Sequence, residues 1–377
     1  MSKMTRITVT SAMLNLRTAC IVISTCATLA AAPKPVDVFV SGTDGYFGYR
    51  IPAIETATDG SLLAFAEGRK NKMSDPGFPG QEVHLVMKRS TNGGETWGAL
   101  KVIENPGPLW SAGNPVPILD RDTKRVWLLY LRDKPERSAV KTARPGTDDI
   151  QLAARWSGDN GIHWSDRIDL TSVSRDLNST NWKSTVVGPA GGIQDQTGRL
   201  FAAAWKLLPW QNFVIFSDDH GKTWQRGGFV PGDEGGDESQ LVELADGRLL
   251  IDMRQGGKGT HRWLSTSNDG GKTWSKRRPG IEVTPVCCAI KRWSLKSTGD
   301  DMNRILWTGP KGPGRSNLVA RVSYNECETF GPAHMLYEGS AAYSSITLLK
   351  GHSAGVLFER DKYHEISFIK LEPKSLD

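Results

Sequence analysis

Short apolar runs separated by turn segments recur along the chain from residue 49 to its end. Most share one form, a turn signal followed by an apolar strand, and these lie at residues 59–69, 124–133, 197–206, 246–254, 303–309 and 353–360. Smaller apolar runs precede them, as at 49–54, 114–118 and 343–348, and others follow, as at 83–87, 212–216 and 318–322. Runs of this length between Gly, Asn and Asp clusters are typical of β-strands. No helical stretch interrupts them, so the sequence predicts an all-β fold.

One octamer recurs after the third run of a set. The copies are STNGGETW from Ser90, SGDNGIHW from Ser157, SDDHGKTW from Ser217, SNDGGKTW from Ser267 and the degenerate SYNECETF from Ser323. In the third copy, Asp219 can accept hydrogen bonds within its own turn, Gly221 can adopt a positive φ, and Trp224 can return the chain to the core. We therefore interpret the octamer as a structural turn between two strands.

A unit of four antiparallel strands, about 57 residues long and repeated six times, predicts a six-bladed β-propeller. It would occupy residues 33–377 as one domain. A β-sandwich is the alternative, but it does not require repeats of one strand order. In a propeller, the octamers share one face. The starts of the first strands and the ends of the second strands share the other face.

The first 32 residues predict a secretory signal peptide. They contain Lys3, Arg6 and Arg17, no acidic residue, an apolar run, and small residues before the expected cleavage site. The apolar run is too short for a membrane anchor and none that follows is longer, so we expect no integral membrane segment after signal removal. We expect a secreted or periplasmic monomer, with a lipoprotein attached through Cys26 as the alternative.

The composition argues against a nucleic-acid-binding, a disulfide-rich or a metal-binding protein. Loss of the three basic residues of the signal segment reduces the formal net charge from +6 to +3, which is not the balance of a nucleic-acid-binding protein. The remaining cysteines, Cys287, Cys288 and Cys327, match neither a disulfide framework nor a metal site. The octamers lack the ligand string of a calcium loop. We therefore expect no nucleic-acid partner, no metal and no cofactor.

Charged and polar residues gather on the face opposite the octamers. They are Arg50, Arg69, Asp75, Asn114, Glu238, Arg254, Arg315, Tyr343 and Glu359. Arg50 has apolar neighbours and Arg254 ends an apolar strand, and buried arginines need anionic partners. With Arg315 they can bind a planar carboxylate through their guanidinium forks. The pattern predicts an anionic ligand, although a surface ion pair is the alternative for any one arginine.

Three short segments are more specific than the octamers. YRIP at 49–52, GNP at 113–115 and DESQ at 237–240 resemble segments of the bacterial sialidase (neuraminidase) family. The resemblance extends over residues 40–375. It implies an exo-sialidase that hydrolyses terminal α-linked sialic acids of glycoproteins, glycolipids or oligosaccharides.

The resemblance also implies a role for each candidate residue. Those implied to bind substrate are the carboxylate-binding Arg50, Arg254 and Arg315, with Arg69 and Asn114. Those implied to be catalytic or supporting are the acid/base Asp75, the nucleophile Tyr343, its base Glu238, and Glu359 beside the first arginine. A neutral phenol suits an anomeric carbon that carries a carboxylate, because a carboxylate nucleophile would meet a like charge. Since tyrosine has a pKa near 10, an adjacent base must take its proton.

Two alternatives remain open. A non-catalytic propeller lectin would keep the arginines and bind sialylated glycans without hydrolysing them. An enzyme that acts on a related nonulosonic acid, or that transfers the sugar to an acceptor, would need the same residues. Trp182, predicted on the active face, is either a sugar platform or a packed core residue.

Overall fold

The computed structural model describes most of the chain after the predicted signal peptide. The described residues are 1, 34–232, 235–257, 259–372 and 376. The signal-peptide prediction thus lies outside the described residues, except for Met1, and Ala32–Asp377 forms one compact unit. Within the described ranges the regular secondary structure is nearly all strand, apart from one short α-helix, α1 (Thr171–Ser174), and three 3-10 helices of one turn each, and this confirms the all-β prediction. No helix in this part of the chain has the length and apolar character needed to cross a membrane.

The strands follow one another as antiparallel meanders. In the first, β2 (Gly48–Thr56) pairs with β3 (Leu62–Arg69), β3 with β4 (Val83–Ser90), and β4 with β5 (Lys101–Glu104). The later strands are β6 (Ser111–Asp120), β7 (Arg125–Asp133), β8 (Ile150–Ser157), β9 (Ile168–Asp169), β10 (Ser184–Val187), β11 (Ile193–Gln194), β12 (Leu200–Leu207), β13 (Gln211–Ser217), β14 (Gln225–Arg226), β15 (Gly236–Glu243), β16 (Leu249–Gln255), β17 (His261–Ser267), β18 (Arg278–Glu282), β19 (Ala289–Ser294), β20 (Arg304–Pro310), β21 (Ser316–Ser323), β22 (His334–Leu348), β23 (Ala354–Arg360) and β24 (Glu365–Leu371). β1 (Val36–Val40) pairs with β24 and so completes the last meander.

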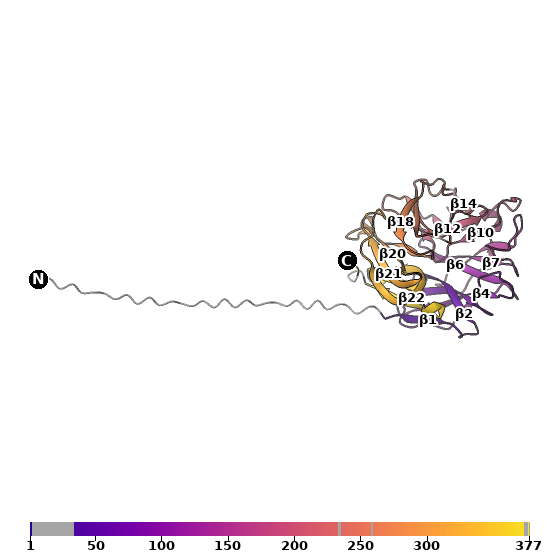
Figure 1. Cartoon of the computed structure of the whole chain (residues 1–377), viewed down its shortest axis with the longest axis horizontal. Helices are drawn as coiled ribbons and strands as arrows, with labels where there is room; N and C mark the ends of the chain where they lie inside the picture. The colour runs from indigo at the N-terminus through magenta and orange to yellow at the C-terminus, as the bar shows by residue number, and fades with distance from the viewer. Residues whose placement is uncertain (2–33, 233–234, 258, 373–375, 377) are drawn as a thin grey trace. The chain divides into compact units, whose positions relative to one another are not determined.

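Neighbouring meanders join in two places. β4 pairs in parallel with β6 through Val83 and Ser111, and the long strand β22 pairs with both β21 and β23. The meanders follow one another in chain order around the compact unit (Figure 1). This arrangement is that of a β-propeller, in which only short edges remain unpaired. Because the joined sheets do not divide into separate blades, the number of six blades stays a prediction.

The octamers form hydrogen-bonded turns. Ser217 Oγ accepts the N–H of Gly221 at 2.7 Å, and Asp219 Oδ1 accepts the N–H of Thr223 at 2.8 Å. Gly221 has a φ of 83°, and a Cβ on it would lie 2.1 Å from the ring of Trp127. Glycine is therefore needed here for both its backbone conformation and its size.

The degenerate last octamer keeps this turn. Cys327 occupies the glycine position with a φ of 65°, and its N–H donates to Ser323 Oγ at 2.9 Å. Asn325 Oδ1 accepts the N–H of Thr329 at 3.0 Å, as the Asp or Asn at the same position does in the other copies. The serine and the Asx side chain thus maintain the turn without glycine.

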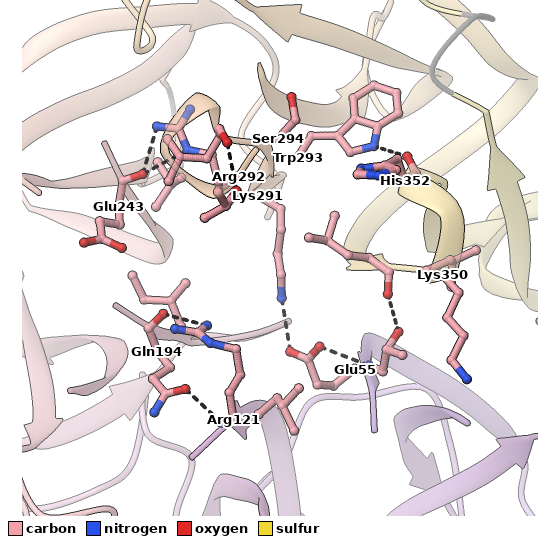
Figure 2. Close-up of a pocket in the computed structure, with 18 of the residues that line it drawn as sticks. Glu55, Arg121, Gln194, Glu243, Lys291, Arg292, Trp293, Ser294, Lys350 and His352 are labelled. Carbon is pink, nitrogen blue, oxygen red and sulfur yellow. Dashed lines mark hydrogen bonds and ion pairs between the residues drawn. The ribbon is translucent and has the colours of Figure 1, made fainter. Parts of the chain in front are cut away.

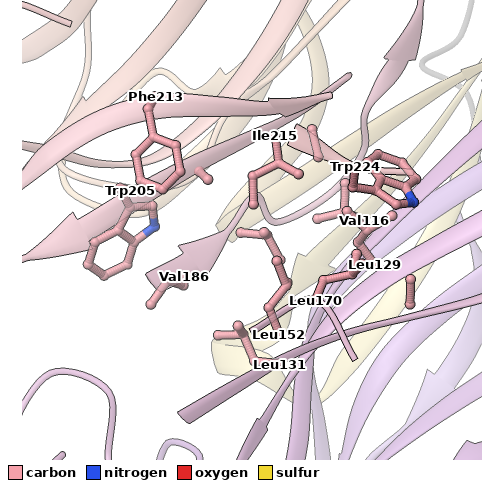
Figure 3. Close-up of a cluster of buried hydrophobic side chains, with 14 of the residues drawn as sticks. Val116, Leu129, Leu131, Leu152, Leu170, Val186, Trp205, Phe213, Ile215 and Trp224 are labelled. Carbon is pink, nitrogen blue, oxygen red and sulfur yellow. The ribbon is translucent and has the colours of Figure 1, made fainter. Parts of the chain in front are cut away.

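Apolar side chains from successive meanders form continuous buried clusters. One of them, drawn in Figure 3, joins Leu129 and Leu152 to Val186, Phe213 and Ile215. Each such side chain contributes about 1.5–3 kcal/mol when fully buried. The strands are fixed by this packing, so the residues at their ends have defined positions.

Trp182 belongs to the same cluster and is only 5% exposed. Its indole N–H donates to the carbonyl of Ser184 at 3.2 Å, and its ring centroid lies 5.9 Å from that of Phe213. Trp182 is therefore a packed core residue, and the interpretation of it as a sugar platform is wrong.

Candidate active site

One cavity, of about 670 Å³, is lined by the C-terminal ends of β2, β6, β15 and β19. Its charged side chains already have partners: Lys291 Nζ lies 3.1 Å from Glu55 Oε2, and Arg292 donates to the carbonyl of Glu243 at 3.0 Å (Figure 2). None of the candidate residues from the sequence lines this cavity.

A second cavity, of about 350 Å³, brings the candidate residues together. Those that line it are Arg50, Arg69, Asp75, Asn114, Glu238, Arg254, Arg315 and Tyr343. Arg50 is near the start of β2 and Glu238 near the start of β15, whereas Arg254 lies near the end of β16. Starts of first strands and ends of second strands therefore meet on one face, as predicted.

Glu359 lies behind Arg50 and is fully buried. Its carboxylate accepts Arg50 Nε at 2.6 Å and Nη2 at 3.2 Å, and it also accepts the backbone N–H groups of Ile51 at 2.9 Å and Tyr343 at 3.2 Å. Burial opposes the charge on Arg50, but Glu359 overcomes this effect and raises the pKa of Arg50. This bidentate pair fixes the orientation of the guanidinium.

Arg254 and Arg315, like Arg50, lie close to Tyr343. Arg254 Nη1 contacts Glu238 and donates to the hydroxyl of Tyr343 at 3.0 Å. Arg315 Nη1 donates to the hydroxyl of Tyr363 at 3.0 Å, and its Cζ lies 5.4 Å from the Tyr343 ring centroid. The Cζ of Arg50 lies 5.3 Å from the same centroid. Three positive charges thus surround one phenol.

Tyr343 donates its hydroxyl proton to Glu238, with both carboxylate oxygens 2.6 Å from the phenol oxygen. Burial raises the pKa of Tyr343 well above its ordinary value, and the negative charge of Glu238 adds to the rise. Arg254, Arg50 and Arg315 act in the opposite direction. The site therefore holds a neutral phenol next to a base, which is the arrangement of an activated nucleophile.

Asp75 lies at the rim of the cavity, with its side chain 67% exposed. Arg69 Nη2 donates to it at 3.1 Å and to the buried Glu67 at 2.8 Å. Glu67 also accepts the N–H of Asn114 at 3.1 Å, and Asn114 Nδ2 donates to the carbonyl of Val187 at 3.1 Å. Asn114, with a φ of 53°, is thus held by protein groups on both sides.

Sequence reasoning missed several residues that line this cavity. Burial raises the pKa of Glu67 and that of Asp133, which also feels the charge of Glu67. Trp205 and Trp210 stack with ring centroids 5.3 Å apart. Only Asp237 had a signal in the sequence, because it precedes Glu238 in the DESQ segment.

One group among the described residues has donor atoms close enough to hold a metal ion: Asp120, Asp122 and His220. It lies away from the second cavity. Gln194 Nε2 donates to Asp120 at 3.0 Å and to Asp122 at 2.9 Å, while Gln194 Oε1 accepts the N–H of Arg121 at 2.8 Å. An amide donor thus already occupies the space between the two carboxylates.

Comparison with known proteins places the chain in a family. The family described as "BNR repeat-like domain" matches residues 60–355. A sialidase of Micromonospora viridifaciens is 29% identical over 88% of this chain and 54% of its own length, and one of Bacteroides fragilis is 26% identical over 87% and 63%. The chain thus spans a little over half the length of these relatives.

Solved structures agree on the fold. A Hadza microbial sialidase, Hz136, superposes with a TM-score of 0.82 at 24% identity, covering 91% of this chain and 69% of the other. The intramolecular trans-sialidase from Ruminococcus gnavus gives 0.77 at 18% identity, covering 92% and 99%. Since the family match covers most of the chain and these relatives are named sialidases, the chain belongs to the sialidase family of proteins with BNR repeats.

Proposed function

We propose that this chain is an exo-sialidase that hydrolyses terminal α-linked sialic acids from glycans, with retention of anomeric configuration through a tyrosine nucleophile. The observation that carries the proposal is the hydrogen-bonded pair of Tyr343 and Glu238 within a group of three arginines. The family relationship supports the substrate class. We also propose that the protein is exported, on the basis of its first 32 residues.

In this mechanism the arginines bind the carboxylate of the sugar. Arg50 and Arg254 make their contacts with protein groups through part of each guanidinium, and both line the cavity. Guanidinium groups bind carboxylates through two parallel hydrogen bonds, which orient the ring as well as hold it. The anomeric carbon is thereby presented to Tyr343.

The first step forms a bond between the phenol oxygen of Tyr343 and the anomeric carbon. The phenol proton passes to Glu238, and the bond to the leaving oxygen breaks as that oxygen takes a proton from Asp75. In the second step, water loses a proton to Asp75 and attacks the anomeric carbon. The phenolate leaves and recovers its proton from Glu238.

The exposure of Asp75 and its contact with Arg69 suit its proposed roles as acid and then base. Its exposed side chain can reach a leaving group or a water at the mouth of the cavity, and Arg69 fixes one of its oxygens at 3.1 Å. The second oxygen is left to exchange protons. Arg69 is itself held by the buried Glu67, so the contact is supported from behind.

The stereochemistry of the product tests this proposal. Two displacements invert the anomeric carbon twice, so proton NMR of the first sialic acid released should show the α anomer. A fluorinated sialosyl fluoride should label the peptide that contains Tyr343. Release of the β anomer first, or labelling of another residue, would falsify the assignment.

Two other functions remain candidates. A lectin would bind a sialic acid analogue but release no sugar from an aryl sialoside. An enzyme that transfers the sugar to an acceptor in place of water would use the same residues. The free products of the purified protein distinguish these functions from hydrolysis.

A further inference from the structure

Among the described residues, three buried polar atoms of neighbouring side chains at the second cavity have no hydrogen-bond partner: Asn212 Oδ1, Asp237 Oδ1 and Arg254 Nε. The backbone carbonyl of Asp237 accepts Asn212 Nδ2 at 2.7 Å. The side chain of Asp237 approaches Arg254, with Oδ1 3.6 Å from Nε. A buried polar atom that lacks a partner costs free energy, so this arrangement needs a reason.

A break in strand register brings two consecutive acids to the same arginine. Side chains of neighbouring residues in a regular strand point to opposite faces. The pairing of β15 with β16 shifts between Gly236 and Ser239, which is where Asp237 and Glu238 lie. Both carboxylates can therefore contact Arg254, Glu238 at Nη1 and Asp237 at Nε.

The guanidinium of Arg254 thus contacts three residues. Its Nε edge faces Asp237, and its Nη1 contacts Glu238 and donates to Tyr343. Among the described residues, Nη2 has no hydrogen-bond partner, and Arg254 lines the cavity where the substrate carboxylate would bind. A small rotation of the guanidinium toward Glu238 would alter the other two contacts.

We propose that Asp237 is a positioning residue, whose negative charge holds the Nε edge of Arg254 and so limits the pull of this arginine on Glu238. This inference rests on the proposed sialidase mechanism. With Asp237 ionised, Glu238 keeps more of its affinity for the proton of Tyr343. Without that charge, Arg254 pairs more strongly with Glu238, and Glu238 becomes a weaker base.

The surroundings of Asp237 make its charge sensitive to pH near neutrality. Burial raises the pKa of Asp237 to about 7. Glu238 on the same strand adds to the rise, whereas Arg254 on β16 and Arg262 on β17 oppose it. As the pH falls through this value, Asp237 gains a proton and its hold on Arg254 weakens.

The test compares Asp237→Asn with the parent in kcat, KM and affinity for a stable sialic acid analogue between pH 5 and 9. We expect kcat to fall at least tenfold at pH 8, with this ratio shrinking as the pH drops below 7, where the parent is also neutral at this position. Affinity for the anionic analogue should increase at pH 8, because a negative charge next to Arg254 has been removed. Asp237→Glu should restore part of kcat.

A matched control is Glu104→Gln. Glu104 is also buried and paired with arginine, 2.7 Å from Arg155, but it does not line the cavity. Its substitution should lower Tm and leave the shape of the pH profile unchanged. If Asp237→Asn behaves in the same way, or loses kcat and affinity in a constant proportion at every pH, Asp237 has only a structural role and the proposal fails.

The binding measurement separates this inference from the proposed function. If the parent binds the analogue but hydrolyses no sialoside, the hydrolase assignment fails. The proposed effect of the Asp237 charge on Arg254 would then still be supported under one condition. Analogue affinity in the parent must rise as the pH falls through about 7, while the Asp237→Asn variant shows no such change. Equal pH dependence in the two proteins would overturn it.

Discussion

Glu238→Gln removes the base from the nucleophile with little change in shape. Glu238 accepts the proton of Tyr343 at 2.6 Å and contacts Arg254. The amide of glutamine can accept a hydrogen bond but cannot take a proton at neutral pH. Loss of a positioned base costs about 10²–10⁴ in rate, or about 2.7–5.4 kcal/mol at about 1.36 kcal/mol for each factor of ten. We expect kcat to fall by this amount at pH 6.

The same substitution should change the pH dependence in a defined direction. The charge of Glu238 raises the pKa of Tyr343, whereas the three arginines lower it. Two charges about 4 Å apart interact by about 4 kcal/mol at an effective dielectric constant of 20, so removal of one stabilises the phenolate appreciably. The variant must then rely on phenolate formed by loss of its proton to solvent. Its kcat should rise roughly tenfold for each pH unit.

The assay is hydrolysis of an aryl sialoside between pH 5 and 9, with Tm and analogue affinity measured to verify folding. The double variant Glu238→Gln with Tyr343→Phe is the control, because without a phenol the rise at alkaline pH should disappear. A single variant with a kcat within threefold of the parent and a parallel pH profile would refute the reasoning. So would an alkaline rise that persists in the double variant.

Three further predictions address binding and stability. Arg254→Lys keeps the charge but loses the fork, so calorimetry should show sialic acid analogue binding weakened by roughly 1.5–3 kcal/mol; unchanged affinity would remove Arg254 from the carboxylate contact. Asp219→Ala removes the turn bonds to Thr223 and should lower the free energy of unfolding by about 1 kcal/mol, with turnover at low temperature preserved; an inactive variant with an unchanged Tm would contradict a structural octamer. The N–H of His163 lowers the pKa of Asp159 to about 2, so this carboxylate stabilises the fold above pH 4 and ceases to do so as the pH falls toward 2. Asp159→Asn should show a smaller loss of Tm over that interval, and an equal loss would exclude this contribution.

The candidate residues were found in the sequence because strand order fixes the face on which each residue emerges. Arg50 and Arg254 come from a strand start and a strand end, and both line the second cavity with Tyr343. Glu359 was implied by resemblance alone, and the structure places it on Arg50. The roles of these residues stay predictions until they are measured.

Whether the missed residues line the cavity depends on side-chain packing, which the pattern of strands in the sequence does not specify. Trp210 lies in the turn between β12 and β13 and reaches the cavity by stacking on Trp205. Trp182 was predicted to lie on the active face, but its ring packs inward against Phe213. Whether an aromatic side chain beside a strand end packs inward or faces the ligand is decided by its neighbours from another meander.

The sequence by itself determined the all-β fold, the turns and the face that carries the site. These depend on local patterns: alternation of apolar runs, the Ser and Asp side chains that bond within their own octamer, and the periodic return of one strand order. The tertiary structure alone decided the register shift that turns Asp237 and Glu238 toward one arginine, and the inward packing of Trp182 against Phe213. Such contacts join residues far apart in the chain, and their geometry depends on how strands pack. No local pattern of residues specifies that packing.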